Sequence, residues 1–74
     1  MKRALVLGAS GGMGYSIVNE LTDRGIEVIA FARTKKKLEK LFSAKQNVTI
    51  FTGDIFKLED LMEAAANVDI IFQA

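Results

Sequence analysis

The stretch that decides the fold lies near the N-terminus and reads Ala4-Leu5-Val6-Leu7-Gly8-Ala9-Ser10-Gly11-Gly12-Met13-Gly14. Its apolar first part, up to Leu7, is typical of a buried strand. The glycines that follow have three uses in a strand-to-helix turn that binds a diphosphate. They allow the sharp turn, the approach of phosphate to backbone N–H groups, and close packing of the helix. Gly8, Gly11 and Gly14 have the spacing for these uses.

Two alternatives compete with this interpretation of the glycine stretch. A Walker-type phosphate loop needs a lysine directly after its last glycine, and the sequence has no lysine between Lys2 and Lys35. A glycine-rich turn without any ligand is the second alternative. A ligand is favoured, because strand, turn, helix and following strand all fall where the dinucleotide fingerprint requires them; the free N–H groups and the dipole of the first helical turn would then attract the phosphates.

Apolar runs and helical patterns alternate along the rest of the chain. Strands are predicted at 5–7, 28–32, 48–52 and 68–72, and helices over 13–21, 38–42 and 58–65, with Thr34 as N-cap of the second helix. The order β-α-β-α-β-α-β predicts an α/β fold of Rossmann type with a parallel sheet. We expect the strand order 3-2-1-4 and a ligand crevice beyond the carboxyl ends of the first and fourth strands.

Composition excludes several classes of function. Lys and Arg number 10 against 9 Asp and Glu, so the net charge gives no reason to expect nucleic acid or an anionic membrane as partner. The sequence has no cysteine and no histidine, which argues against thiolate chemistry and against a metal site. The N-terminal apolar run is too short for a secretory signal and no run approaches a membrane span, so a cytoplasmic protein is expected.

The glycine stretch resembles that of the short-chain dehydrogenase/reductase superfamily. Gly8-x-x-Gly11-x-x-Gly14 is similar to its extended and atypical members, which include NAD-dependent epimerase/dehydratase-like and NmrA-like proteins. Gly8-x-x-x-Gly12-x-Gly14 also fits the compact members, so the branch stays open. The resemblance continues at Gly53-Asp54-Ile55 and in the segment 68–74.

The resemblance implies a domain that is incomplete at 74 residues, because a doubly wound domain needs about twice this length. We expect residues 1–74 to form the N-terminal NAD(P)-binding half-domain of a longer protein. Its fourth strand would either pair with a second copy or be covered by the missing C-terminal half, because an open strand edge is a template for pairing.

The cofactor site expected from the turn and the resemblance comprises Gly8, Ser10, Gly11, Gly12, Met13, Gly14, Arg33, Lys37, Asp54, Ile55 and Ala74. Ser10 would bind phosphate or cap the first helix. The resemblance implies that Asp54 accepts a hydrogen bond from the adenine amino group and that the Ile55 backbone contacts the ring. The alternative for Asp54 is the N-cap of the third helix.

The residue that closes the second strand favours NADP over NAD, with NAD as the second choice. NAD-binding proteins usually place a carboxylate there, whereas this sequence has Ala32-Arg33, and an arginine can bind the 2′-phosphate of NADP in a bidentate way. Lysines 35 to 37 follow in the first turn of a helix, where the dipole disfavours cations. The alternative for these lysines is a solvated face on which Lys36 or Lys37 neighbours Glu39.

No catalytic residue is expected within the chain. The resemblance implies a Tyr-x-x-x-Lys pair, but the residue four positions after Tyr15 is Asn19. Tyr15 is therefore expected to pack at the edge of its helix. The parent protein is then an NAD(P)-dependent oxidoreductase or epimerase, or alternatively a non-catalytic NmrA-like dinucleotide sensor.

Overall fold

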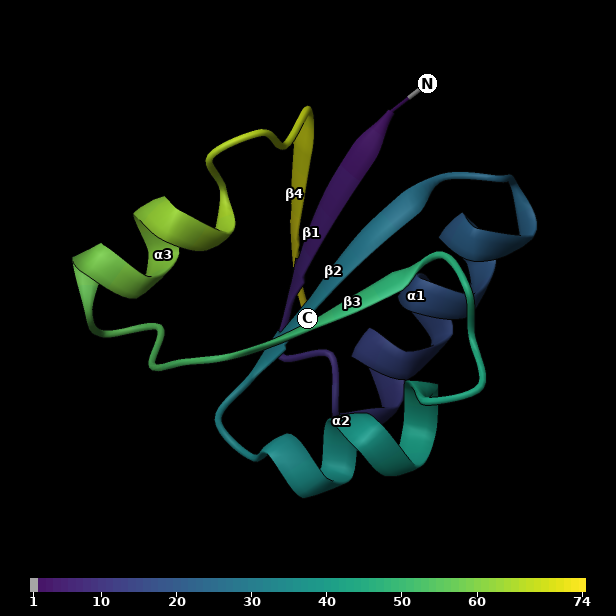
Figure 1. Cartoon of the computed structure of the whole chain (residues 1–74), viewed down its shortest axis with the longest axis horizontal. Helices are drawn as coiled ribbons and strands as arrows, with labels where there is room; N and C mark the ends of the chain where they lie inside the picture. The colour runs from purple at the N-terminus through teal and green to yellow at the C-terminus, as the bar shows by residue number, and fades with distance from the viewer. Residues whose placement is uncertain (1) are drawn as a thin grey trace.

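Four parallel strands joined by three helices make up the fold, which a computed structural model describes over residues 2–74. The strands are β1 (Arg3–Leu7), β2 (Glu27–Ala32), β3 (Val48–Thr52) and β4 (Ile70–Gln73), and the helices are α1 (Gly12–Asp23), α2 (Lys35–Phe42) and α3 (Leu58–Ala64) (Figure 1). The predicted α/β class and the order of elements are confirmed.

The sheet has the order β3-β2-β1-β4, as predicted. The central position of β1 is visible in its register, since Val6 lies opposite Ala30 of β2 on one side and Phe72 of β4 on the other. All three strand pairs are parallel. The carboxyl ends of all four strands therefore lie at the same end of the sheet.

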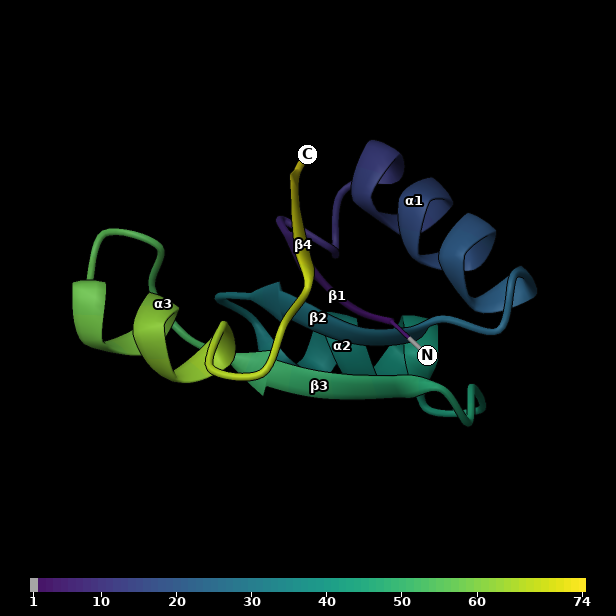
Figure 2. The ribbon, with the colours of Figure 1, turned by 90° about the horizontal axis from the view of Figure 1, so that it is seen from above.

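Alternation of side chains along β1 separates two apolar layers. Ala4 and Val6 join the core cluster that contains Val18 of α1 and Leu38 of α2. Leu5, on the opposite face, joins the cluster of Phe31 and Ala64 at the end of α3. The helices accordingly cover opposite faces, and Figure 2 shows α1 and α3 on opposite sides of β4.

The fourth strand begins later than the sequence pattern predicts. Val68 donates its N–H to the Ala65 carbonyl at 3.2 Å and belongs to the turn after α3. Asp69 is held by two bonds to Arg3, one to the Arg3 carbonyl at 2.8 Å and one from the Arg3 N–H to its own carboxylate at 2.9 Å. The regular strand therefore starts at Ile70.

The covering of the two faces is unequal. On the side of α3, Phe56, Leu58 and Met62 have 86%, 69% and 64% of their surface exposed, and on β4 the figures are 45% for Ile70 and 54% for Ile71.

Between residues 2 and 74, no helix has the length and apolar character that a membrane span requires.

Candidate functional site

The glycine turn begins with a residue in the left-handed region, Gly8 at a φ of 75°, where a side chain would be strained. The N–H groups of Gly8 and Ala9 both donate to the Phe31 carbonyl, at 2.9 and 3.1 Å. Two donors on one acceptor fix the start of the turn to β2. Backbone hydrogen bonds and the burial of Ala9 in the core therefore fix the position of the turn together.

Gly14 lets α1 pack directly on this turn. A Cβ atom at Gly14 would collide with the Gly8 carbonyl oxygen and would lie 2.8 Å from the Ala9 Cα. A Cβ atom at Gly11 would lie 3.6 Å from the Gly8 oxygen, an ordinary contact, and one at Gly12 would have no neighbour within 4 Å. The fold thus requires Gly14, whereas Gly11 and Gly12 leave space beside the turn.

Free backbone donors gather where α1 begins. The N–H of Gly11 donates to the Gly8 carbonyl at 3.1 Å. Within residues 2–74, no acceptor takes the N–H groups of Ser10, Gly12, Met13 or Gly14. Unpaired donors at a helix N-terminus form a site for an anion. Gly11 is the N-cap and has no side-chain cap bond, so Ser10 does not cap the helix as one alternative predicted.

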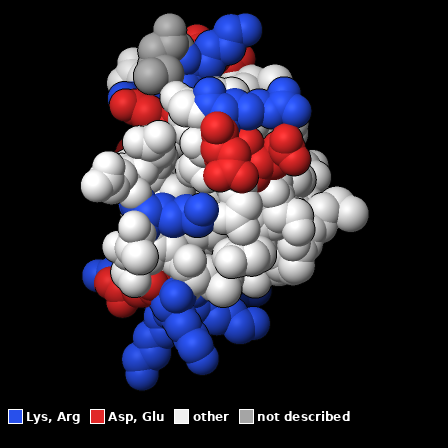
Figure 3. Space-filling model, turned by 90° about the vertical axis from the view of Figure 1, so that its right-hand side faces the viewer, with Lys and Arg blue, Asp and Glu red and all other residues white. Residues whose placement is uncertain are grey.

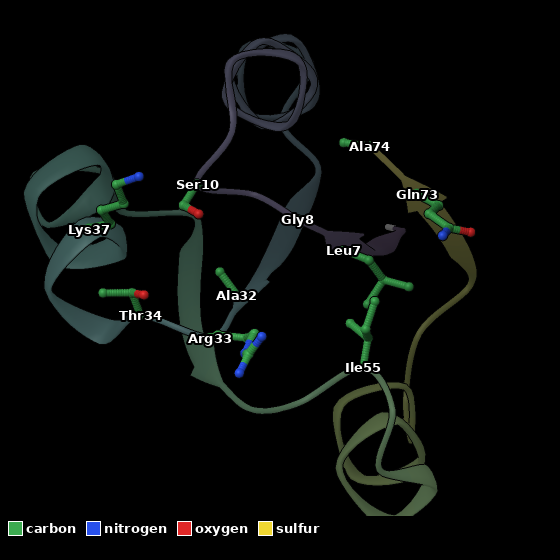
Figure 4. A pocket seen from close by; sticks show the side chains of 10 residues that line it. All are labelled: Leu7, Gly8, Ser10, Ala32, Arg33, Thr34, Lys37, Ile55, Gln73 and Ala74. Atoms are coloured by element: carbon green, nitrogen blue, oxygen red, sulfur yellow. The ribbon is translucent and has the colours of Figure 1, made fainter.

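A cavity of about 330 Å³ lies beyond the carboxyl ends of the strands. Its walls come from the ends of β1, β2 and β4, from α2 and from the loop after β3, and consist of Leu7, Gly8, Ser10, Ala32, Arg33, Thr34, Lys37, Ile55, Gln73 and Ala74 (Figure 4). The Ala74 N–H donates to the Leu7 carbonyl at 3.1 Å and so joins the ends of β1 and β4. This is the crevice that the strand order predicts.

The charged side chains of the cavity wall are both cationic, Arg33 and Lys37. In Figure 4 Lys37 extends from α2 toward Ser10, and Arg33 projects from the end of β2. Neither has an ion pair within residues 2–74. Basic side chains gather at the lower end of the molecule in Figure 3, the end at which α2 lies in Figure 1.

The N-terminal turn of α2 differs in two details from the sequence predictions. Glu39 pairs with Lys35 at 4.0 Å, because the i,i+4 spacing places these two residues on the same helical face. The predicted neighbours, Lys36 and Lys37, make no ion pair with Glu39 within residues 2–74. Thr34 occupies the N-cap position as predicted, but its hydroxyl makes no cap bond. Thr34 contributes to the cavity wall instead.

The loop after β3 brings an apolar residue to the cavity. Leu7 and Ile55 point toward one another in Figure 4 and form an apolar part of the wall. Asp54 precedes Ile55 but does not line the cavity. Its Oδ1 accepts the Phe56 N–H at 2.9 Å, and the N-cap of α3 is Lys57. The alternative prediction of Asp54 as the N-cap was therefore wrong.

Part of the predicted site comes together in this cavity. Six of the predicted residues line it: Gly8, Ser10, Arg33, Lys37, Ile55 and Ala74. Gly11, Gly12, Met13, Gly14 and Asp54 are outside its wall. Four residues of the wall were not predicted as site residues: Leu7, Ala32, Thr34 and Gln73. Leu7 and Ala32 end β1 and β2, so the predicted ends of these two strands were the signal that could have found them. Gln73 ends β4, one residue beyond the predicted end of that strand.

Tyr15, the one tyrosine of the sequence, lies outside the cavity wall. Tyr15 packs against Phe42 of α2, with ring centroids 5.7 Å apart, as expected for a residue at the helix edge. The described residues contain no group of three acidic, cysteine or histidine side chains that could hold a metal ion.

The parallel sheet, the glycine turn and the crevice together define a Rossmann-type domain. A family model described as NAD(P)H-binding matches residues 8–74. The chain belongs to this family of NAD(P)H-binding domains.

Known proteins similar to the chain are much longer. A 3-beta-hydroxysteroid dehydrogenase of Mycolicibacterium neoaurum is 40% identical over 95% of the chain. The photosystem II assembly factor Ycf39 of Synechocystis is 35% identical over 97%. The chain spans 18% and 22% of these two relatives. A short-chain dehydrogenase from Streptomyces avermitilis superposes with a TM-score of 0.82 at 29% identity, covering 96% of this chain and 30% of that one.

Proposed function

We propose that the chain binds a nicotinamide dinucleotide and prefers NADP(H) to NAD(H). In this proposal it is the N-terminal, nucleotide-binding half-domain of a short-chain dehydrogenase/reductase-like oxidoreductase or epimerase. The observation that supports the preference for NADP(H) is the pair of cations in the cavity wall, Arg33 and Lys37. β2 ends at Ala32, with no carboxylate at the position where NAD-binding proteins usually have one.

The diphosphate would lie on the unpaired N–H groups at the start of α1. Ser10, Gly12, Met13 and Gly14 offer these donors, and Gly11 leaves the approach open because it has no side chain. The N-terminal end of the α1 dipole adds to the attraction. The Ser10 hydroxyl, which makes no hydrogen bond within residues 2–74, would donate to the same phosphates.

The adenosine end would lie between α2 and the loop after β3. Arg33 and Lys37 would bind the 2′-phosphate, where the planar guanidinium can make two parallel hydrogen bonds. Ile55 would cover one side of the adenine ring, and Asp54 would accept from its amino group. The chain end at Gln73 and Ala74 would approach the ribose and diphosphate from β4.

The experiment that tests the preference is the substitution Arg33→Ala. NADPH affinity should fall by roughly ten- to a hundredfold, the value of hydrogen bonds to a charged group. NADH affinity should stay within about twofold, because NADH has no 2′-phosphate for the guanidinium to contact. Isothermal titration calorimetry with both cofactors measures the two effects separately.

The matched control is Lys36→Ala, which removes the same charge from an exposed position outside the cavity wall. Its NADPH affinity should be close to that of the wild type. An equal loss of NADPH and NADH in Arg33→Ala, or a wild-type preference for NADH, contradicts the proposed NADP preference.

A non-catalytic dinucleotide sensor is the second candidate function. It is favoured by the similarity to a relative that is named as an assembly factor rather than as a dehydrogenase. The two candidates differ in the residues beyond the cofactor half: an enzyme of this superfamily would carry a Tyr-x-x-x-Lys pair on a later helix. Sequencing the gene beyond Ala74 and measuring NADPH oxidation by its full product would distinguish them.

A further inference from the structure

The loop between β3 and α3 carries both residues that would contact adenine, Asp54 and Ile55. Its first residue is tied to the sheet, since the Gly53 N–H donates to the Ala32 carbonyl at 3.1 Å. The next N–H, that of Asp54, donates to a side chain instead of the sheet. Its acceptor is Oδ2 of Asp60, at 3.0 Å.

Two carboxylates, those of Asp60 and Asp54, each accept a backbone N–H of this loop. Asp60 accepts the Asp54 N–H, and Asp54 Oδ1 accepts the Phe56 N–H at 2.9 Å. The Asp54 carbonyl accepts the Lys57 N–H at 3.0 Å. The orientation of the Asp54 carboxylate therefore depends on a backbone that Asp60 holds.

Packing adds to the hydrogen bond. A Cβ atom at Gly53 would lie 2.9 Å from Cζ of Phe31 and 3.2 Å from Cβ of Asp60. Gly53 is thus enclosed between a ring of the buried core and the Asp60 side chain. The ring itself is fixed, because Phe31 is fully buried and stacks on Phe51 with centroids 5.4 Å apart.

A purely helix-capping role does not account for the contact that Asp60 makes. Asp60 is the third residue of α3, and a carboxylate there would cap the helix by accepting the N–H of the N-cap residue. The N-cap is Lys57, whose N–H donates to the Asp54 carbonyl. Asp60 instead accepts from Asp54, three residues before the N-cap.

We propose that Asp60 is a positioning residue for the adenine end of the cofactor site, acting through the Asp54 N–H. This proposal rests on the proposed dinucleotide binding. Asp60 does not line the cavity; it fixes the loop that places Ile55 in the wall and Asp54 beside it. Recognition of the adenine amino group then depends on a side chain outside the site.

The test compares Asp60→Ala, Asp60→Asn and Glu59→Ala by two measurements. Glu59→Ala is the matched control, since it removes the same charge from an exposed neighbour in α3. Asparagine keeps a side-chain oxygen that can accept the Asp54 N–H. The first measurement is amide hydrogen exchange of Asp54 and Phe56 by NMR without cofactor. The second is the ratio of affinities for NADPH and its hypoxanthine analogue, which has a carbonyl oxygen in place of the adenine amino group.

In Asp60→Ala, exchange at Asp54 should accelerate by roughly tenfold, corresponding to one lost hydrogen bond. The wild-type preference for adenine over hypoxanthine should be roughly tenfold, and in Asp60→Ala it should fall toward one. Asp60→Asn should retain most of the wild-type protection of the Asp54 N–H and most of the wild-type preference for adenine. Glu59→Ala should match the wild type in both measurements.

Unchanged exchange and an unchanged adenine preference in Asp60→Ala would overturn the proposal. An equal effect in Glu59→Ala would also overturn it, because charge alone would then account for the result. If the wild type binds neither dinucleotide, the proposed function fails, and the exchange of Asp54 in Asp60→Ala still decides whether Asp60 holds the loop.

Discussion

Phe31 contacts both loops of the candidate site, the glycine turn through its backbone carbonyl and the loop after β3 through its ring. Its carbonyl accepts the N–H groups of Gly8 and Ala9 at the start of the glycine turn. Its ring lies against Gly53 at the start of the loop after β3. The two loops, which are proposed to hold the phosphates and the adenine, are thereby fixed relative to each other by a residue of the core.

Gly14 should tolerate no side chain. Alanine is favoured over glycine in a helix by about 1 kcal/mol, but in Gly14→Ala the new Cβ meets two backbone groups of the turn that cannot move independently. We expect a net loss of about 1–3 kcal/mol in the free energy of unfolding. Urea denaturation measures it, with Gly11→Ala as the control that should change stability by only about 0.5 kcal/mol. Equal stability of the two variants would contradict the close packing.

Gly11 should matter for binding where Gly14 matters for folding. Gly11 has an extended backbone, with φ −81° and ψ 168°, which any residue can adopt. Gly11→Val should therefore fold, while its side chain lies beside the free N–H groups and blocks the diphosphate. NADPH affinity should fall more than roughly tenfold, because the phosphate bonds are charge-assisted. Binding equal to that of the wild type would show that the stretch is only a turn.

At the scale of the element, α2 has three of its four lysines at the end where the helix dipole disfavours cations. Three lysines, 35 to 37, lie in its first turn, which has no acidic residue. A helix N-terminus disfavours each exposed cation by about 0.3–1 kcal/mol. Of the three side chains, only Lys37 belongs to the cavity wall.

Reversing one charge at each end of α2 should have opposite effects on stability. Lys36→Glu should stabilise the cofactor-free protein by about 0.3–1 kcal/mol, whereas Lys40→Glu, in the last turn, should destabilise it by a similar amount. Both variants create an oppositely charged pair between positions 36 and 40. The difference between their free energies of unfolding therefore reports the effect of the helix dipole at the two ends. Chemical denaturation at low salt measures it, and the difference should shrink in 1 M salt. Effects of the same sign would contradict this electrostatic account.

The elements and their order were predictable because each depends on a local pattern. The strands over 28–32 and 48–52 follow from short apolar runs, and burial of β2 on both faces accounts for its continuous run. The role of Asp54 was not predictable, because an aspartate before a helix can cap it or close a turn with equal ease. Asp60, in α3, accepts the Asp54 N–H, and no local pattern encodes that pairing.

The same limit applies to the cavity wall. Arg33 and Lys37 were identifiable from charge and from their place after a strand. Leu7 and Gln73 belong to the wall because β1 and β4 lie side by side in register. That register depends on contacts between residues more than sixty positions apart, such as the bond between Arg3 and Asp69.

At the scale of the whole molecule, β4 is an edge of the sheet with exposed apolar side chains. It pairs only with β1 among the described strands, and Ile70 and Ile71 are about half exposed. An apolar open edge favours pairing with another chain. We therefore expect the 74-residue product to self-associate along β4 when it is produced alone.

Multi-angle light scattering on a product of verified mass tests this association. Ile71→Lys should shift the protein toward the monomer, because a charge on an edge strand opposes pairing. Thr49→Lys on β3, the other edge of the sheet, is the control and should leave the association unchanged. A wild-type monomer at high concentration with a cooperative unfolding transition would show that the chain is stable without a neighbour and would contradict the expected association.

The central position of β1 also has a consequence for the time course of folding. The two neighbours of β1 emerge from the ribosome at different times, β2 soon after it and β4 last of all. Since synthesis proceeds at roughly 5–20 residues per second, the unit β1-α1-β2 is complete seconds before the other side of β1 can be covered. During that interval the N–H groups of Gly8 and Ala9 can already bind the Phe31 carbonyl, so the turn proposed to hold the phosphates can form on the ribosome before β4 exists.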